Sequence, residues 1–173
     1  MKNQVKLILM LIAFLLPCIK SFGQGTQFKA MYIYKFAKGV SWPNADNNGG
    51  DFVITIVGDN ELAAALKKSV GTRKIGSRNI VVLETATIAQ LKKSEVIYLG
   101  ESKNDQIQKL VESQKNNHVL IISGKSGWCQ HGACISFVNK NGALAYEVSN
   151  KNIQKAGLNC SQEILRSGTN VDQ

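Results

Sequence analysis

The chain has 173 residues, in which 21 lysines and arginines outnumber 12 aspartates and glutamates, giving a formal net charge of +9. The cationic residues are scattered among acidic ones and do not form a basic strip interleaved with aromatic residues, which argues against a nucleic-acid-binding protein. This length fits one domain with a sizeable hydrophobic core, and we see no internal repeat or low-complexity segment that would indicate a second domain.

Residues 1–23 have the pattern of a secretory signal peptide. Lys2 and Lys6 precede the apolar block Leu7–Leu16, and the small residues Ser21 and Gly23 suit the positions before a cleavage site. The apolar block has about ten residues, roughly half of the length that spans a bilayer, so a cleaved signal fits better than a retained anchor. The expected mature chain is residues 24–173, a single exported α/β domain.

A lipoprotein is the other alternative at this end of the chain. Cys18 would be the lipidated residue, but Pro17 stands directly before it, where a small residue is expected. We therefore expect Cys18 to be removed with the signal peptide.

Residues 28–40 predict a largely buried helix. Apolar side chains occupy most of its circumference, with three lysines at the remaining positions. The helix is expected to end before Trp42-Pro43, because proline disfavours helical geometry in the residue that precedes it. Residues 44–50 have the composition of a loop.

Residues 52–124 alternate between apolar, β-branched runs and helical segments. A turn after the first strand offers Asp59 or Asn60 as the N-cap of the first of these helices. Continuous apolar strands separated by helices are typical of a mostly parallel sheet covered by helices on both faces. The expected strands are residues 53–57, 78–84, 94–100 and 117–124, and the expected helices are residues 61–70, 87–93 and 102–116.

Residues 133–149 predict an antiparallel β-hairpin at one end of this sheet. The hairpin signal is Asn141-Gly142 between two strand-forming runs, because these residue types adopt the left-handed geometry that a tight turn needs. The predicted fold is therefore an α/β domain with a mostly parallel central sheet, helices on both faces and a C-terminal antiparallel β-hairpin.

The last residues predict two short helices and a frayed end. The first helix, residues 150–159, is closed by Gly157. The second is expected to start with a capping pair, Asn159 and Gln162. We expect residues 168–173 to be frayed.

No catalytic or cofactor-binding pattern is visible. One glycine, Gly58, follows the strand at 53–57, where a dinucleotide-binding loop would need three. The two histidines, His118 and His131, belong to no metalloprotease helix or nucleophile elbow. The sequence therefore predicts a protein that is not an enzyme, with no catalytic residue, no metal and no cofactor.

The segment "GWCQHGACISF", Gly127–Phe137, has three interpretations. Cys129, His131 and Cys134, with the later Cys160, could supply zinc ligands, but three ligands in so short a loop would be crowded. A redox couple would normally have the spacing C-x-x-C, and here four residues separate the cysteines.

In an exported protein, a disulfide between Cys129 and Cys134 is the expected state. It would fix the shape of the turn before the hairpin. Cys160 is then either a buried thiol or an alternative partner of Cys134. Trp128 and His131 lie beside this loop and are candidate contacts for a partner protein.

Several blocks of the sequence resemble the YfiR-like family of exported bacterial proteins. The opening block "FKAMYIYKFAKGVSWP" places Tyr32, Tyr34 and Phe36 on a helix that runs into Trp42 and Pro43. Further blocks, "ITIVGDNELAAAL", "VIYLGES", "LIISGKSGW" and "LAYEVSNKNIQKAGLNCSQEIL", follow in the order and spacing of the family. The resemblance covers roughly residues 28–165, and its first and last blocks are the specific ones.

This resemblance implies a periplasmic repressor. Members of the family bind the periplasmic sensory domain of an inner-membrane diguanylate cyclase, and an outer-membrane-associated protein sequesters the repressor. A sensor kinase is a related possible partner. The resemblance also implies a homodimer, a disulfide at the place of Cys129 and Cys134, and, as a variant, a module that senses a small ligand. The five aromatic and proline residues of the opening block would serve structure or an interface.

The sequence departs from the family in two places. The paired glycines that commonly precede the strand after the cysteine loop are Gly132-Ala133 here. A second disulfide found in some members has no counterpart, because no cysteine occurs between Gln24 and Trp128. Any property that depends on that second bridge is not expected in this chain.

Overall fold

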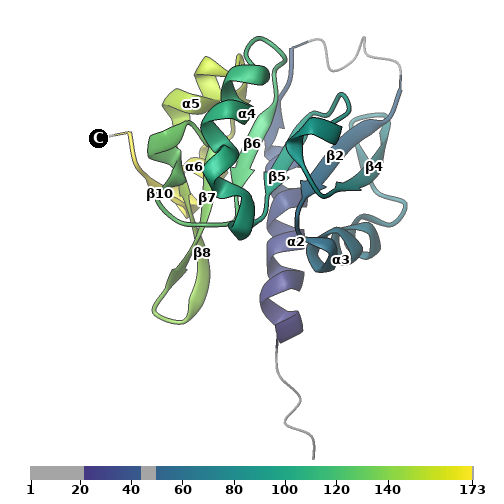
Figure 1. The fold of residues 1–173 in the computed structure, drawn as a ribbon, viewed down its shortest axis with the longest axis horizontal. Helices are drawn as coiled ribbons and strands as arrows, with labels where there is room; N and C mark the ends of the chain where they lie inside the picture. Colours follow the sequence, from purple (N-terminus) through teal and green to yellow (C-terminus); the bar gives the residue numbers. More distant parts are fainter. Residues whose placement is uncertain (1–21, 44–49, 173) are drawn as a thin grey trace, which may run out of the picture.

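A computed structural model describes residues 22–43 and 50–172 of the chain. The centre of the fold is an eight-stranded sheet with the order β10-β8-β7-β6-β5-β2-β4-β3 (Figure 1). The strands are β2 (Phe52–Val57), β3 (Lys74–Ile75), β4 (Arg78–Thr85), β5 (Val96–Leu99), β6 (Leu120–Ser123), β7 (Ile135–Lys140), β8 (Ala143–Val148) and β10 (Thr169–Asn170).

The predicted fold class is confirmed. Strands β4, β2, β5, β6 and β7 pair in parallel, and the β7–β8 hairpin is antiparallel and lies near one end of the sheet. Asn141 and Gly142 form its turn with φ angles of 54° and 82°, the left-handed geometry expected for this pair. A separate two-stranded antiparallel sheet joins β1 (Val40–Ser41) to β9 (Asn159–Cys160).

Helices cover both faces of the sheet. On one face, α2 (Phe22–Gly39) and α3 (Asn60–Val70) pack on strand residues such as Ile54 and Tyr98. On the other face, α4 (Ile107–Ser113) packs on the alternate residues, such as Ile97. The last two helices are α5 (Asn150–Lys155) and α6 (Gln162–Ser167). Strands β2, β5 and β6 are almost entirely apolar, because both of their faces are buried.

Local signals explain where several helices begin and end. Asp59 caps α3, because its Oδ1 accepts a hydrogen bond of 3.0 Å from the backbone N–H of Leu62. Gly157 has a φ of 71° directly after α5, and this left-handed conformation ends the helix. Both caps are those that the sequence predicts.

On the face covered by α2 and α3, the core contains an aromatic cluster that joins α2 to the hairpin. The fully buried ring of Phe36 lies 4.8 Å from the ring of Tyr146 and 6.0 Å from that of Phe137, measured between centroids. Tyr32 stacks on Phe36 at 5.8 Å, and Tyr98 of β5 approaches Phe137 at 6.3 Å. The two contacts of Phe36 connect α2 to strands that follow more than 100 residues later in the chain.

The helix α2 differs from the prediction in extent and in burial. It begins at Phe22, six residues earlier than expected, and ends at Gly39. Residues 1–21 of the predicted signal peptide and the loop residues 44–49 lie outside the described part of the chain. The outer side of α2 is not buried, because Phe28 and Met31 are each 50% exposed.

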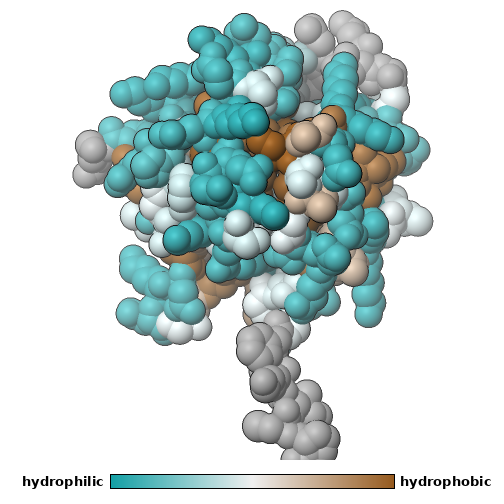
Figure 2. Space-filling model, in the orientation of Figure 1, coloured by the Kyte–Doolittle hydropathy of each residue, from teal (hydrophilic) through white to brown (hydrophobic). Residues whose placement is uncertain are grey.

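Two helices predicted for the face that α4 covers differ in the structure: the first is absent as an α-helix, and the second is shorter. Residues 87–93 contain a single 3₁₀ turn, η1 (Ile88–Gln90), whose N-cap makes no side-chain hydrogen bond. Residues 102–116 start as a 3₁₀ segment, η2 (Glu101–Gln106), and become α-helical at Ile107. Among the described residues, β2 and β4 therefore have no α-helix over them on this face. Apolar surface shows in this region in Figure 2.

The predicted C-terminal cap and frayed tail are wrong. Asn159 lies in β9, and Ser161 takes the N-cap position of α6. The tail is ordered, because β10 pairs with β8 and Asp172 accepts hydrogen bonds from the hydroxyl of Ser149 and the N–H of Lys151. These contacts are tertiary, so local sequence patterns do not reveal them.

The aromatic cluster predicts a clear contrast between two phenylalanines of α2. Phe36→Ala should reduce the free energy of unfolding by about 3–5 kcal/mol, because it removes a fully buried ring. Phe28→Ala, on the exposed side of the same helix, should change it by about 0.5 kcal/mol or less. Urea denaturation of both variants measures this difference, and equal losses would contradict the described packing of α2.

Candidate functional site

The carboxyl ends of the parallel strands are the first place to look for a site. The chain leaves β2 through Gly58 towards α3 on one face, and leaves β5 through Gly100 towards α4 on the other. Open α/β sheets bind ligands at such a switch point, in the crevice outside the strand ends. In this protein the switch point lies between β2 and β5.

Side chains fill that crevice. The buried hydroxyl of Tyr98 donates a hydrogen bond of 3.4 Å to Oδ2 of Asp59, the residue that caps α3. Burial raises the pKa of Tyr98, and the nearby carboxylates of Asp59 and Glu101 raise it further, so the phenol stays neutral. Lys103 covers Gly58, where an added Cβ would lie 2.8 Å from its Cγ atom. The switch point is therefore packed shut.

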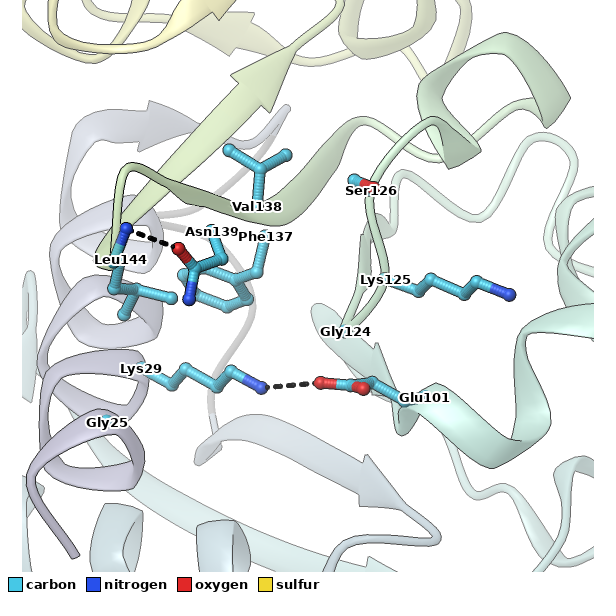
Figure 3. A pocket seen from close by; sticks show the side chains of 11 residues that line it. Gly25, Lys29, Glu101, Gly124, Lys125, Ser126, Phe137, Val138, Asn139 and Leu144 are labelled. Atoms are coloured by element: carbon cyan, nitrogen blue, oxygen red, sulfur yellow. Dashed lines mark hydrogen bonds and ion pairs between the residues drawn. The ribbon is translucent and has the colours of Figure 1, made fainter. Parts of the chain in front are cut away.

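The open space lies beside the switch point, in a cavity of about 400 Å³ between α2, the hairpin and the loops after β5 and β6 (Figure 3). Nζ of Lys29, on α2, lies 3.0 Å from Oε1 of Glu101, and the pair reaches across the cavity. Phe137 and Leu144 of the hairpin supply the apolar wall. The cavity therefore combines an ion pair with an apolar wall.

The loops that frame this cavity are held by a buried polar network. The hydroxyl of Ser123 donates to Oδ1 of Asn104 at 2.6 Å, and the amide nitrogen of Asn104 donates to the carbonyl oxygens of Gly100 and Glu101. The backbone N–H of Lys125 in turn donates to the Ser123 hydroxyl. The network locks the loop after β5 to the loop after β6.

The histidines do not assemble a reactive group. Nδ1 of His118 lies 3.1 Å from the carbonyl oxygen of Ala156, and the ring of His131 lies 4.8 Å from that of Trp128. Within residues 22–43 and 50–172, no group of three or more His, Cys, Asp and Glu side chains is arranged to hold a metal ion.

The cysteine loop is a short 3₁₀ segment, η3 (Trp128–His131), fixed by hydrogen bonds. The side-chain amide of Asn152 donates to the carbonyl oxygens of Cys129, at 2.7 Å, and of Ala133, at 2.8 Å. Sγ of Cys129 lies 3.3 Å from the hydroxyl oxygen of Ser136. These hydrogen bonds tie the loop to α5 and to β7.

All three described cysteines are free thiols in the structure, so the disulfide between Cys129 and Cys134 stays a prediction. Burial raises the pKa of Cys129 to about 11, that of Cys134 to about 12 and that of Cys160 to about 11. In the reduced protein these groups are neutral thiols at physiological pH and are poor nucleophiles.

The predicted partner contacts beside this loop occupy different environments. Trp128 is half-buried against the core formed with α4, whereas His131 is exposed beside it. A partner could reach the histidine and one edge of the indole. Their role in partner binding stays a prediction.

The residues of the opening block pack inside the fold or at its edge. Tyr32 and Phe36 belong to the aromatic cluster, and Tyr34 lies on another side of α2, with the guanidinium of Arg73 5.1 Å from its ring centre. Trp42 packs edge-on against the ring of Phe52 at 5.0 Å. Pro43 is exposed in the turn that follows. The contacts of the four aromatic residues are structural.

The sequence analysis missed the exposed apolar pair on α2. Phe28 and Met31 are the large hydrophobic side chains that are exposed among the described residues, and they lie one turn apart on the same helical face. The signal was present in the helical spacing, because Ile33, Phe36 and Ala37 define the opposite, buried face. We define Phe28, Met31 and the neighbouring Lys35 and Lys38 as the outer face of α2.

Comparison with known proteins supports the resemblance seen in the sequence. The protein-family model described as YfiR/HmsC-like matches residues 26–169, nearly the whole described chain. No curated protein matches the chain. Within the described ranges, no helix is both long enough and apolar enough to cross a bilayer.

We predict that mature protein isolated from its host contains the Cys129–Cys134 disulfide. Peptide mapping without reduction should find the two cysteines in one cross-linked peptide, while Cys160 remains alkylatable after unfolding. Free thiols at Cys129 and Cys134 in unreduced protein would contradict this.

The raised thiol pKa values also predict a pH dependence for the reduced protein. In the unfolded chain a thiol has a pKa near 8.5. In the folded protein, the pKa is about 11 for Cys129 and about 12 for Cys134. Unfolding therefore releases protons, and the free energy of unfolding should fall as the pH rises from about 8.5 to 11. Urea titrations should give a shallower fall for Cys134→Ala, and an identical fall would contradict the burial of this thiol.

Proposed function

The chain belongs to the YfiR/HmsC-like family, and from this premise we propose that it is an exported repressor of cyclic di-GMP signalling. This family consists of periplasmic regulators of diguanylate cyclase signalling and is not catalytic. In our proposal, the protein binds the periplasmic sensory domain of an inner-membrane diguanylate cyclase, or of a related sensor such as a kinase, and holds down its output.

The exposed apolar pair on α2 is the observation that supports a protein-binding role. Phe28 and Met31 are half-exposed, although large apolar side chains elsewhere in the described chain are at least partly buried. Figure 1 shows the first turns of α2 extending beyond the ends of strands β2 and β5. Exposed apolar side chains grouped on one surface are typical of interaction sites.

The charges of α2 indicate what kind of surface it fits. The helix contains three lysines and no acidic residue. Lys35 pairs at 3.0 Å with Glu163, and Lys38 lies exposed one turn further along. The outer face therefore suits a partner that offers an apolar pocket with an acidic rim.

Two further interactions belong to this proposal through the family resemblance. An outer-membrane-associated protein would sequester the repressor and relieve the block, and the repressor would form a homodimer. The outer face of α2 is one surface for which these partners could compete.

Sensing of a small ligand is a second candidate function. The cavity of about 400 Å³ between α2 and the hairpin favours it, because the volume is that of a small-molecule site. A ligand that binds only the folded state raises the melting temperature, so a thermal-shift screen of metabolites tests this function. The absence of a shift with any compound would count against it.

The main proposal predicts that deletion of the gene raises cellular cyclic di-GMP and biofilm formation, and that the wild-type gene restores both. The double variant Phe28→Ser and Met31→Ser should fold with an unchanged melting temperature but fail to restore repression. The matched control is Gln108→Ser with Lys109→Ser, at two exposed positions of α4, which should repress normally.

Two outcomes would contradict the proposal at different levels. Unchanged cyclic di-GMP in the deletion strain would contradict the regulatory function. Full repression by the α2 variant would leave that function in place and exclude the outer face of α2 as the contact.

A further inference from the structure

A second cavity lies away from α2, between α4 and α5, which lie side by side in Figure 1. Its volume is about 400 Å³. We call it the α4–α5 groove. Its floor consists of four apolar side chains and one buried cysteine, namely Val111, Val119, Ile121, Ala156 and Cys134.

Two small residues keep the groove open. Gly132 has a φ of 104° and lies against Val111, where an added Cβ would approach Cγ2 of the valine to 3.0 Å. Ala156, at the end of α5, presents only a methyl group. Larger side chains at these positions would fill the space between the helices.

One wall of the groove is rigid. Asn152 of α5 donates both of its amide hydrogens, to the carbonyl oxygens of Cys129 and Ala133. This holds α5 at a fixed distance from the loop that carries Gly132. The groove is therefore largely formed before a ligand arrives, as small-molecule sites usually are.

The rim carries a net positive charge. Lys115, in the turn after α4, lies 3.7 Å from Glu112, and both of these side chains are exposed. Lys155 of α5 stands on the opposite side and has no acidic partner within ion-pair distance among the described residues. One cation thus remains uncompensated above an apolar floor.

We propose that the α4–α5 groove binds a small amphipathic anion, with its apolar body on Val119 and Ile121 and its charged group at Lys155. The volume lies within the range of small-molecule sites, roughly 300–1,000 Å³, and is too small for a folded partner. The site is separate from the proposed repressor contact, because no residue of α2 lines the groove.

Two fluorescent probes of nearly the same shape test the proposal. 1-Anilinonaphthalene-8-sulfonate is an aromatic body with one negative charge, and N-phenyl-1-naphthylamine is the same body without it. Wild-type protein should bind both. Lys155→Gln should lower the affinity for the sulfonate probe by about threefold to tenfold and leave the affinity for the neutral probe unchanged.

Matched variants separate the groove from the general surface. Lys151→Gln removes a lysine one turn earlier on α5 that does not line the groove, and it should change neither affinity. Ala156→Leu should fill the groove and lower the affinity for both probes by more than about tenfold. Circular dichroism at the probe concentrations used should show a folded protein in every case.

Several results would overturn the proposal. If Lys151→Gln lowered the affinity for the sulfonate probe as much as Lys155→Gln does, the overall charge of the protein would be what attracts the probe. Unchanged binding to Ala156→Leu would place the probes elsewhere, and failure of the folded wild type to bind either probe would remove the site. A repression assay reads a different surface, so none of these results depends on the proposed function.

Discussion

The packing of Phe36 against the β7–β8 hairpin is the contact on which the rest of the structure depends. It brings the first helix of the described chain against strands that follow more than 100 residues later, and their rings meet 4.8–6.0 Å apart. Closing so long a loop costs chain entropy, which a fully buried aromatic cluster offsets through the area it removes from water. Because α2 and the hairpin are joined in this way, they also enclose the cavity beside Glu101.

In our proposal, the same helix serves two requirements on opposite faces. Ile33, Phe36 and Ala37 are fully buried and hold α2 in place, whereas Phe28 and Met31 are half-exposed. A protein that used one set of side chains for both folding and binding would lose stability whenever its surface changed. With the proposed arrangement, the outer face could change along with a partner, while the buried face stays constrained by the core.

Much of the fold could be predicted from the sequence, because its signals are local. Apolar β-branched runs gave the parallel strands, Asn141-Gly142 gave the hairpin, and Asp59 gave a helix cap that the structure contains. The errors arise where distant residues decide. The tail is ordered by the bonds of Asp172 to Ser149 and Lys151, and both cavities form between segments that are far apart in the chain.

The ordered tail has a consequence for when folding can finish. A chain emerges from the ribosome, or from an export channel, with its amino end first, so β8 appears before the strand β10 that covers its edge. The first turn of α5 likewise waits for the carboxylate of Asp172. The native edge of the sheet is thus completed only by the last described residues. In a partly emerged chain, the edge of β8 remains unpaired. A chain that is still passing through a narrow channel therefore cannot yet have completed its fold.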